Sequence, residues 1–359
     1  MHFASPSYGV HTALWWNITY GHIPELQYAA EMDFGWVKQN IAWRDVEDQV
    51  KGEYNTFRPD RLVEEAEKEG VNLLFRLDRS PTWATGGVPV ENGPPENYQD
   101  FGDFCGWMAG QQAGRVKAYQ VWNEPNLDRE WGGKPPSPEA YTELLKVCYE
   151  AIKSADPDAI VISAGLAPTG LYTELVMPDD IFLRRMYEAG AADYFDVLGL
   201  NAPGYRAPPH VSPDEVADPD NGYGGHRTFA FRHVEDMREI MVEFGDAHKQ
   251  VAILEMGWIT NEQHHYTEKT LDDLHPAYAW YAVDEQTQAD NLVGAYEYAR
   301  ENWQPWIGLM TTIYIADFNW WPETHEQWWW SIVRHDGTRR PAFDALKAMP
   351  KDQLPISED

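Results

Sequence analysis

The feature that most constrains the fold of this chain is a regular alternation of short apolar segments with amphipathic ones. The apolar segments are rich in β-branched and aromatic residues and are bounded by turn-forming residues, which predicts β-strands. The segments between them repeat their apolar residues at helical spacing. Strands are predicted at residues 8–14, 35–41, 71–77, 116–122, 159–163, 197–200, 250–255 and 306–315. Helices are predicted at residues 23–32, 60–69, 98–112, 137–155, 180–189, 231–245, 286–302 and 343–349.

Eight strand–helix units predict an α/β fold of the (β/α)8 TIM-barrel type, with the chemistry at the carboxyl ends of the strands. An open doubly wound sheet is the rival, but it gives no reason for the alternation to stop after eight near-equal units. The 359 residues exceed the usual size of one domain, yet barrels often reach this length. Because no low-complexity linker interrupts the chain, we predict a single domain, residues 1–359, with elaborated strand-to-helix loops.

Charge and aromatic content limit the classes of ligand. With 28 basic and 58 acidic residues the formal net charge is −30, which argues against nucleic acids and anionic membranes as partners. Seventeen Trp and nineteen Tyr exceed what core packing alone requires, so some aromatic rings should line a cleft. Sugar rings pack their apolar faces on aromatic rings, which favours a carbohydrate ligand. A large Trp-rich core accounts for part of the same excess.

The two cysteines, Cys105 and Cys148, fall in predicted helices and lack metal-site spacing. Buried free thiols are expected, with one disulfide as the alternative. No apolar run reaches 18 residues, and residues 1–7 contain no apolar signal core, so a soluble protein is expected. A polymeric substrate would favour a secreted or extracytoplasmic location, with a cytoplasmic one left open.

The fourth predicted strand ends in Val-Trp-Asn-Glu-Pro-Asn, residues 121–126. A residue before proline disfavours helical geometry, so Glu124 is expected at the carboxyl end of this strand. Asn123 would lie beside it as an amide, and Trp122 as an aromatic wall. Taken alone, the tripeptide around Glu124 is more simply explained as a turn.

A second carboxylate, Glu255, follows the apolar residues 251–254 at the end of the seventh predicted strand. A carboxylate directly after a buried strand is costly unless it is hydrogen-bonded or used in chemistry. In an eight-stranded barrel, Glu255 and Glu124 would point into the mouth from opposite sides. A structural salt bridge explains Glu255 alone equally well, whereas the pair in one barrel favours catalysis.

Asn123-Glu124-Pro125 after strand four, with Glu255 after strand seven, resembles the retaining glycoside hydrolases of clan A, in particular cellulase-like and family 39-like members. The resemblance implies that Glu124 is the acid/base, that Glu255 is the nucleophile and that Asn123 hydrogen-bonds the 2-hydroxyl of the sugar. It extends over nearly the whole chain and includes Trp43 with Glu47, residues 52–54, residues 81–84 and the Trp-rich segment after strand eight.

Glycoside cleavage needs two carboxylates in different protonation states. One donates a proton to the poor leaving group, and the other traps the developing oxocarbenium ion from the opposite face. Retaining enzymes hold the two carboxyl groups about 5 to 5.5 Å apart and inverting ones about 6.5 to 9.5 Å apart. Because a sequence does not give this distance, retention is implied here only by the resemblance. An apolar wall such as Trp122 would help keep Glu124 protonated.

Other residues at the predicted rim are candidates for binding the sugar. Arg76 could donate to Glu255 or a sugar, or form a salt bridge, and His11 could bind hydroxyls or pack at the rim. Tyr205 follows strand six, where related enzymes often place an aromatic residue near the nucleophile. The candidate stacking platforms are Trp43, Trp83, Trp258, Trp320 and Trp321, of which some are expected to be core.

Two positions depart from the family pattern. Relatives commonly carry an arginine in strand two, where this chain has Lys38-Gln39-Asn40, and a histidine after strand six, where it has Asn201. Lysine and asparagine still donate hydrogen bonds, but without the rigid fork of arginine or the titration of imidazole. The departures therefore affect the expected sugar preference and leave the catalytic pair intact.

The leading hypothesis is a retaining glycoside hydrolase that cleaves β-linkages of a neutral poly- or oligosaccharide. A non-catalytic glycan-binding barrel and a transglycosylase with the same carboxylates are the alternatives. No cofactor is expected, because the sequence has no Gly-rich phosphate loop, and no zinc site is expected, because His264 and His265 are adjacent rather than one helical turn apart. Residues 218–222 offer oxygen atoms but lack the calcium-loop pattern, so they are expected to cap a turn.

Overall fold

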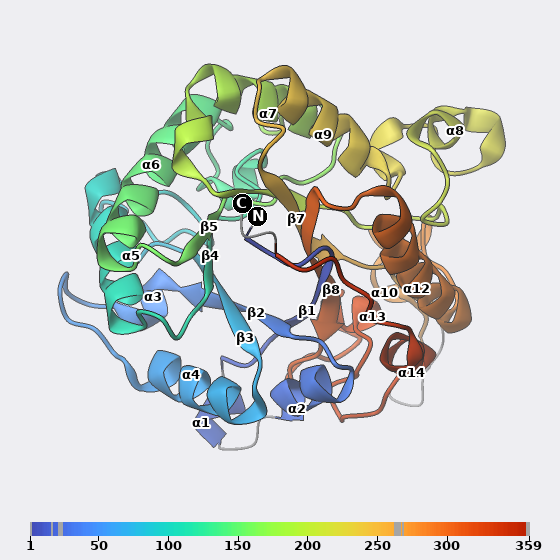
Figure 1. The fold of residues 1–359 in the computed structure, drawn as a ribbon, viewed down its shortest axis with the longest axis horizontal. Helices are drawn as coiled ribbons and strands as arrows, with labels where there is room; N and C mark the ends of the chain where they lie inside the picture. The colour runs from blue at the N-terminus through green and yellow to red at the C-terminus, as the bar shows by residue number, and fades with distance from the viewer. Residues whose placement is uncertain (1, 16, 21–23, 262–266, 268, 357–359) are drawn as a thin grey trace.

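The computed structural model describes residues 2–15, 17–20, 24–261, 267 and 269–356, and its strands form one closed parallel barrel in the order β1 to β8 (Figure 1). The predicted (β/α)8 fold is thereby confirmed, and the open doubly wound sheet is excluded. The strands are β1 Ser7–Thr12, β2 Trp36–Ala42, β3 Asn72–Asp78, β4 Ala118–Val121, β5 Ile160–Ile162, β6 Val197–Asn201, β7 Gln250–Met256 and β8 Ile307–Ile315.

Helices surround the barrel, as the view down its axis in Figure 1 shows. The longer ones are α2 Pro24–Glu31, α4 Phe57–Glu69, α5 Tyr98–Gln111, α6 Pro138–Ala155, α7 Asp179–Glu188, α9 His233–Glu243, α12 Glu285–Asn302 and α14 Pro341–Ala348. Shorter ones are α1 Asn17–Tyr20, α3 Trp43–Val46, α8 Pro213–Ala217, α10 Leu271–Leu274, α11 Pro276–Ala279 and α13 Gln327–Trp330. The 3-10 helices are η1 Asp128–Glu130, η2 Ala191–Tyr194, η3 Pro219–Asn221 and η4 Arg227–Phe229.

The core has two layers, because successive strand side chains point to opposite sides of the sheet. Leu74, Ala118, Ile160, Leu254 and Leu309 belong to a small cluster that fills the barrel interior. Their neighbours along the strands, such as Leu73 and Ile253, belong to the larger cluster between the barrel and the helices. This alternation directs side chains near the strand ends into the barrel mouth.

The two cysteines form a disulfide, so the expectation of free thiols is wrong. Cys105 of α5 and Cys148 of α6 are both fully buried, and their Cα atoms lie 5.4 Å apart. The helical periodicity had placed each thiol on the buried face of its helix. The packing of α5 against α6 then brings the two faces together at bonding distance.

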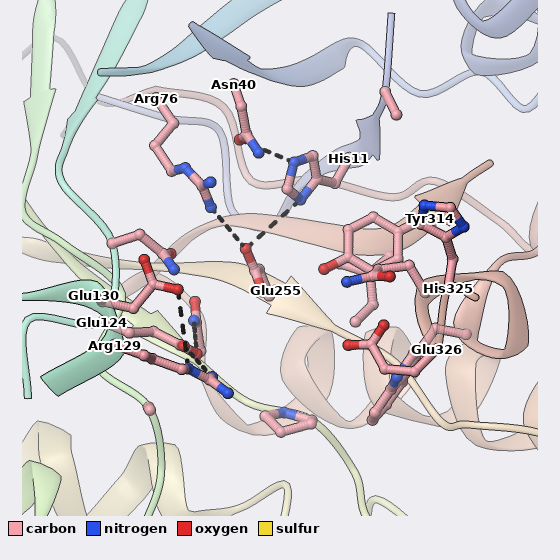
Figure 2. A pocket seen from close by; sticks show the side chains of 18 of the residues that line it. His11, Asn40, Arg76, Glu124, Arg129, Glu130, Glu255, Tyr314, His325 and Glu326 are labelled. Atoms are coloured by element: carbon pink, nitrogen blue, oxygen red, sulfur yellow. Dashed lines mark hydrogen bonds and ion pairs between the residues drawn. The ribbon is translucent and has the colours of Figure 1, made fainter. Parts of the chain in front are cut away.

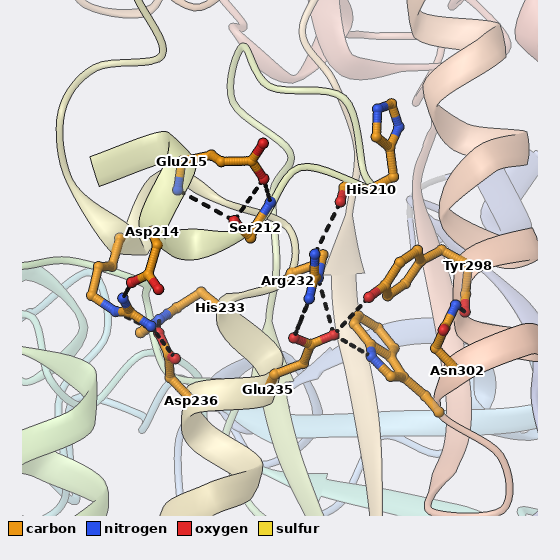
Figure 3. Close-up of polar contacts among 12 residues, drawn as sticks. His210, Ser212, Asp214, Glu215, Arg232, His233, Glu235, Asp236, Tyr298 and Asn302 are labelled. Atoms are coloured by element: carbon orange, nitrogen blue, oxygen red, sulfur yellow. Dashed lines mark hydrogen bonds and ion pairs between the residues drawn. The ribbon is translucent and has the colours of Figure 1, made fainter. Parts of the chain in front are cut away.

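Ion pairs secure the long loop between β6 and α9 (Figure 3). Arg227 pairs with Asp236 at 2.6 Å, and Arg232 donates to the His210 carbonyl and to Glu235. His233 lies between Asp236 and Asp179 of α7, at 2.8 and 3.0 Å. Although burial opposes it, these carboxylates raise the pKa of His233 to about 10, so the imidazolium persists at neutral pH. The loop is therefore held against two helices.

Residues 218–222 form the turn that their composition predicts. The Asp218 side chain accepts a hydrogen bond from the Asp220 amide at the start of η3, and Gly222 ends it in a left-handed conformation. His264 and His265 lie outside the described residues. Within the part of the chain that the structure describes, no helix is sufficiently long and apolar to traverse a membrane.

Candidate active site

A cavity of about 920 Å³ opens at the carboxyl ends of the strands. Residues near the ends of β1, β2, β3, β6, β7 and β8, and residues from the loops after β4 and β5, line it, and both Glu124 and Glu255 are among them (Figure 2). Of the other predicted sugar-binding residues, His11, Arg76, Asn123, Asn201, Tyr205 and Trp320 line the same cavity. The fold thus brings together residues as far apart in the sequence as His11 and Trp330.

Glu124 is held by a rigid loop after β4. Its backbone amide donates to the Gly165 carbonyl at 3.0 Å, and its φ of 40° lies in the left-handed region, where a non-glycine residue is uncommon. Asn126 fastens the same loop to the neighbouring one, because its side chain exchanges hydrogen bonds with the amide and carbonyl of Ala167. Contacts with the loop after β5 thus fix the position of the loop that carries Glu124.

Two side chains contact the Glu124 carboxylate. Asn201 Nδ2 donates to Oε1 at 3.0 Å, and Arg129 Nη2 lies 2.9 Å from Oε2. The Arg129 side chain is 65% exposed, so this ion pair lies at the solvent side of the cavity. Asn201 occupies the position where the family resemblance leads one to expect a histidine, and its amide contacts the proposed acid/base directly.

Glu255 reaches the cavity through an irregularity in the sheet. Leu254 before it points into the barrel interior, so strict alternation would turn Glu255 towards the helices. The register between β6 and β7 shifts between Leu200 and Asn201, so that Leu200 pairs with Ile253 and Asn201 pairs with Glu255. Such a bulge re-aims a side chain, and here Glu255 faces the barrel mouth.

Three basic side chains surround one oxygen of Glu255, Oε1, and Figure 2 shows two of them, His11 and Arg76. Lys38 Nζ lies 3.1 Å away, Arg76 Nη1 3.4 Å and His11 Nδ1 3.7 Å. Lys38 is fully buried and also donates to the Leu254 carbonyl at 3.0 Å, while Arg76 Nε pairs with Asp78 at 2.9 Å. All three groups are anchored in strands, so Glu255 lies in a fixed electropositive environment.

The charges of these neighbours follow from their surroundings. Burial lowers the pKa of Lys38 to about 8, with Glu255 opposing the shift, so that the ammonium is retained at neutral pH. Burial and the nearby Lys38 and Arg76 lower the pKa of His11 well below its usual value, which leaves the imidazole neutral. Its Nε2 contacts Asn40 Oδ1 at 3.1 Å, an arrangement that places the ring beside Glu255.

Unpartnered polar atoms and aromatic rings complete the lining. Asn123 is buried, and its Oδ1 has no hydrogen-bond partner among the described residues, so it is free to meet a ligand donor. Tyr205 adopts a φ of 47° after Gly204. A Cβ at Gly204 would overlap the Trp258 ring, so glycine is required for the loop to pass this close.

Several predicted aromatic contacts do not reach the cavity. Trp43, Trp122 and Trp258 are fully buried, so the proposed wall and two of the stacking platforms are core residues. Trp122 has a φ of 73°, and its indole donates to the Glu130 carbonyl while packing on Phe101 and Trp131. Trp258 supports the Tyr205 loop through the Ala207 carbonyl.

Two more tryptophans lie near the rim but outside the lining. Trp83 donates to the Glu47 carbonyl and packs edge-on against Trp43, and Trp321 is half exposed against His335. Trp320 alone of the five platforms lines the cavity, with its ring against that of Tyr314. Lys38 is not exposed to the cavity and contributes through Glu255.

Sequence reasoning missed part of the lining, notably Arg129, Glu130, Tyr314 and Glu326. Arg129 and Glu130 follow Glu124 by five and six residues in the same loop, and this closeness was the available signal. Tyr314 lies inside the apolar run of β8, where nothing distinguishes it from a core residue. Its hydroxyl faces Glu255 closely enough that burial and the Glu255 charge together raise its pKa well above the usual value.

Solved structures share this fold, whereas no protein-family model and no curated protein matches the sequence. A family 39 glycoside hydrolase from the gut symbiont Bacteroides cellulosilyticus WH2 matches 96% of the chain at 19% identity, with a TM-score of 0.65. The chain spans 63% of that protein's length. Native xylanase 10B from Thermotoga maritima matches 96% of the chain and 94% of its own, at 16% identity and a TM-score of 0.59. At such identities the likeness concerns the fold alone.

Proposed function

We propose that this protein is a retaining glycoside hydrolase that cleaves β-glycosidic bonds, with Glu255 as nucleophile and Glu124 as acid/base. The observation that carries the proposal is the contrast between the two carboxylates in one cavity. Glu255 lies among the buried side chains of Lys38 and Arg76, which stabilise an anion. Among the described residues, Glu124 is contacted by a neutral amide and one exposed cation, which stabilise its negative charge less than the buried cations stabilise that of Glu255.

In the first step, Glu255 attacks the anomeric carbon while Glu124 protonates the departing glycosidic oxygen. The C–O bond to the leaving group breaks as the ester bond to Glu255 forms. The Asn123 amide, beside Glu124, would hydrogen-bond the 2-hydroxyl of the sugar, a contact that strengthens as positive charge develops on the ring. The buried cations around Glu255 stabilise its negative charge before attack and again when the carboxylate leaves.

In the second step, Glu124 removes a proton from water as the water attacks the anomeric carbon, and the bond to Glu255 breaks. Arg129 contributes here, because its guanidinium stabilises the ionised form of Glu124 that acts as base. Two displacements at the same carbon return the original anomeric configuration. Interception of the ester by a sugar hydroxyl instead of water would give transglycosylation with the same residues.

The assignment is tested by Glu255→Gln. This variant keeps the size of the side chain and removes the nucleophilic oxygen anion, so turnover should fall on the order of 10⁴-fold or more on any glycoside that the parent cleaves. A panel of β-linked polysaccharides with product sizing supplies the substrate. Wild-type turnover by Glu255→Gln would contradict the proposed nucleophile. Tight glycan binding by the parent protein without release of reducing ends would instead favour a non-catalytic glycan-binding barrel.

We also propose that the protein works outside the cytoplasm. The Cys105–Cys148 disulfide supports this location, since disulfides persist in oxidising compartments and are rare in the cytosol. A polymeric substrate, which does not cross membranes, supports it as well. Fractionation of the native host tests the proposal, and recovery of the protein only in the cytosolic fraction with reduced thiols would contradict it.

A further inference from the structure

Glu326 is one of the cavity carboxylates that the two-step reaction does not use. It lines the cavity from the segment between β8 and α13, and Figure 2 shows it across the pocket from Glu124 and Arg129. Its Oε2 atom is buried and has no hydrogen-bond partner among the described residues. A buried carboxylate oxygen without a donor is costly, so a ligand donor at this point would relieve an existing penalty.

The two carboxylates of the proposed reaction each have a cation in contact. Among the described residues, Glu326 has none. Glu124 pairs with Arg129 at 2.9 Å and Glu255 with Lys38 at 3.1 Å. No Lys, Arg or His nitrogen of the described chain lies within ion-pair distance of a Glu326 oxygen. The cavity lining as a whole is acidic, with seven Asp and Glu residues against three Arg. Among the described residues, a negative charge at Glu326 therefore has no cation in contact, and Arg129 acts on it only from a distance.

Tyrosine side chains lie near the Glu326 carboxylate. Burial raises the pKa values of Tyr278, Tyr281 and Tyr314, and the nearby charge of Glu326 adds to each increase. All three tyrosines line the cavity, as does Trp330 at the end of α13. Aromatic faces beside a carboxylate attract cations, because the ring quadrupole and the anion act in the same direction. The surroundings of Glu326 thus favour a cationic group over a neutral one.

The protonation of Glu326 agrees with a missing counter-charge. Burial raises its pKa to about 7, and the negative charges of Glu255 and Glu124 add to this effect, while the Gln327 backbone amide and Arg129 act against it. Burial thus disfavours the ionised form of Glu326 near neutral pH. A bound cation would favour the ionised form and would form a charge-assisted hydrogen bond with it.

On the premise of the proposed glycosidase activity, we propose that the cavity takes an amino sugar and that Glu326 binds its protonated amine. The substrate class is then a β-glycoside with a free amino group rather than a fully neutral glycan. Its amino group is on the sugar that faces Glu326, in the segment between β8 and α13. Glu326 would act as a specificity-determining residue that contacts the substrate away from the scissile bond. The net charge of −30 assists, because it attracts cationic oligosaccharides to the surface.

The test compares the binding of methyl β-glucoside with that of its four monoamino analogues, which carry the amine at C2, C3, C4 or C6. Calorimetry near neutral pH measures binding to the parent protein, to Glu326→Gln and to Glu323→Gln. Gln at 326 keeps the shape and removes the charge. Glu323 is exposed in the same segment and does not line the cavity, so its variant controls for the loss of one surface charge. Thermal unfolding verifies that both variants fold.

At least one amino analogue should bind about tenfold more tightly than methyl β-glucoside, the size expected of one desolvated charge-assisted contact. Glu326→Gln should reduce that preference to about twofold or less, and Glu323→Gln should retain it. If no analogue binds better than the parent glucoside, including the case in which none binds, the ammonium site is overturned. A preference that survives Glu326→Gln overturns it too. If the protein cleaves only glycosides without an amine, the proposed hydrolase is supported and the ammonium site is contradicted. If it binds the amine but cleaves no glycoside, the ammonium site is supported and the proposed hydrolase is contradicted.

Discussion

The two carboxylates proposed for catalysis occupy opposite kinds of surroundings within one cavity. Glu255 is contacted by Lys38 and Arg76, whose side chains are 0% and 6% exposed and project from strands. Glu124 is contacted by Arg129, which is 65% exposed and projects from a 3-10 helix in a loop. The difference indicates a division of labour, since a nucleophile must stay ionised while an acid/base must change its protonation state twice in each cycle.

After loss of the nucleophile itself, removing the proton donor should give the largest effect. Glu124→Gln should lower kcat/KM by about 10³-fold for glycosides with poor leaving groups, because nothing then protonates the departing oxygen. For 2,4-dinitrophenyl glycosides of the same sugar, which need no protonation, the loss should stay below about tenfold. Steady-state kinetics on a series of leaving groups measures the contrast.

Glu130→Gln is the matched control for this experiment. Glu130 lines the same cavity and accepts a hydrogen bond from Asn92, but it does not contact Glu124 by hydrogen bond or ion pair among the described residues. Its replacement should change kcat/KM by a similar factor for glycosides with good and with poor leaving groups. If Glu124→Gln also lowered kcat/KM by the same factor for every leaving group, the acid role would belong to another residue.

The buried cation beside Glu255 should have the next largest effect. Lys38→Met should lower kcat/KM about 10²-fold, the usual cost of losing one preorganised electrostatic contact. In the parent protein, Lys38 loses its proton as the pH rises through about 8, so activity should step down there. The variant lacks the cation at every pH, so this step should be absent from its pH profile. Lys68→Met, a change of an exposed lysine in α4, should keep it. An unchanged step in Lys38→Met would contradict the role of Lys38.

The exposed cation beside Glu124 should have the smallest effect. Arg129→Gln should lower kcat by no more than about tenfold on substrates with activated leaving groups, for which the second step limits turnover. The value of kcat/KM, which reports the first step, should change little. Arg44→Gln, which breaks a neighbouring ion pair with Glu91 and does not touch Glu124, serves as control. If Arg129→Gln lowered activity more than Lys38→Met, the exposed cation beside Glu124 would matter more than the buried cation beside Glu255, which would contradict the comparison.

The fold was predictable because its signal is local and repeated. Parallel strands buried on both faces are near-continuous apolar runs, and all eight were found with boundaries within about two residues. Their helices carry a regular apolar stripe. The position of Glu124 and Glu255 at strand ends followed from the same pattern, because barrel mouths lie at the carboxyl ends of strands.

The details of the site were less predictable, because they depend on long-range geometry. Trp122 and Trp320 both sit beside polar residues at strand ends, yet the first is core and the second lines the cavity. A left-handed backbone at Trp122 turns its indole towards α5, and no local pattern marks that conformation. The bulge that directs Glu255 into the mouth, and the loop that carries Glu326, likewise depend on contacts between distant segments.

Azide rescue of two alanine variants tests the central claim, the assignment of one role to each carboxylate, most directly. Azide should restore turnover of an activated β-glycoside by Glu255→Ala and give the α-glycosyl azide, because azide then attacks from the face that Glu255 occupied. With Glu124→Ala it should give the β-glycosyl azide, formed from the intact ester at Glu255 without need of a base. Proton NMR of the anomeric products distinguishes the two. The same anomer from both variants, or the reverse assignment, would contradict the roles proposed for Glu124 and Glu255.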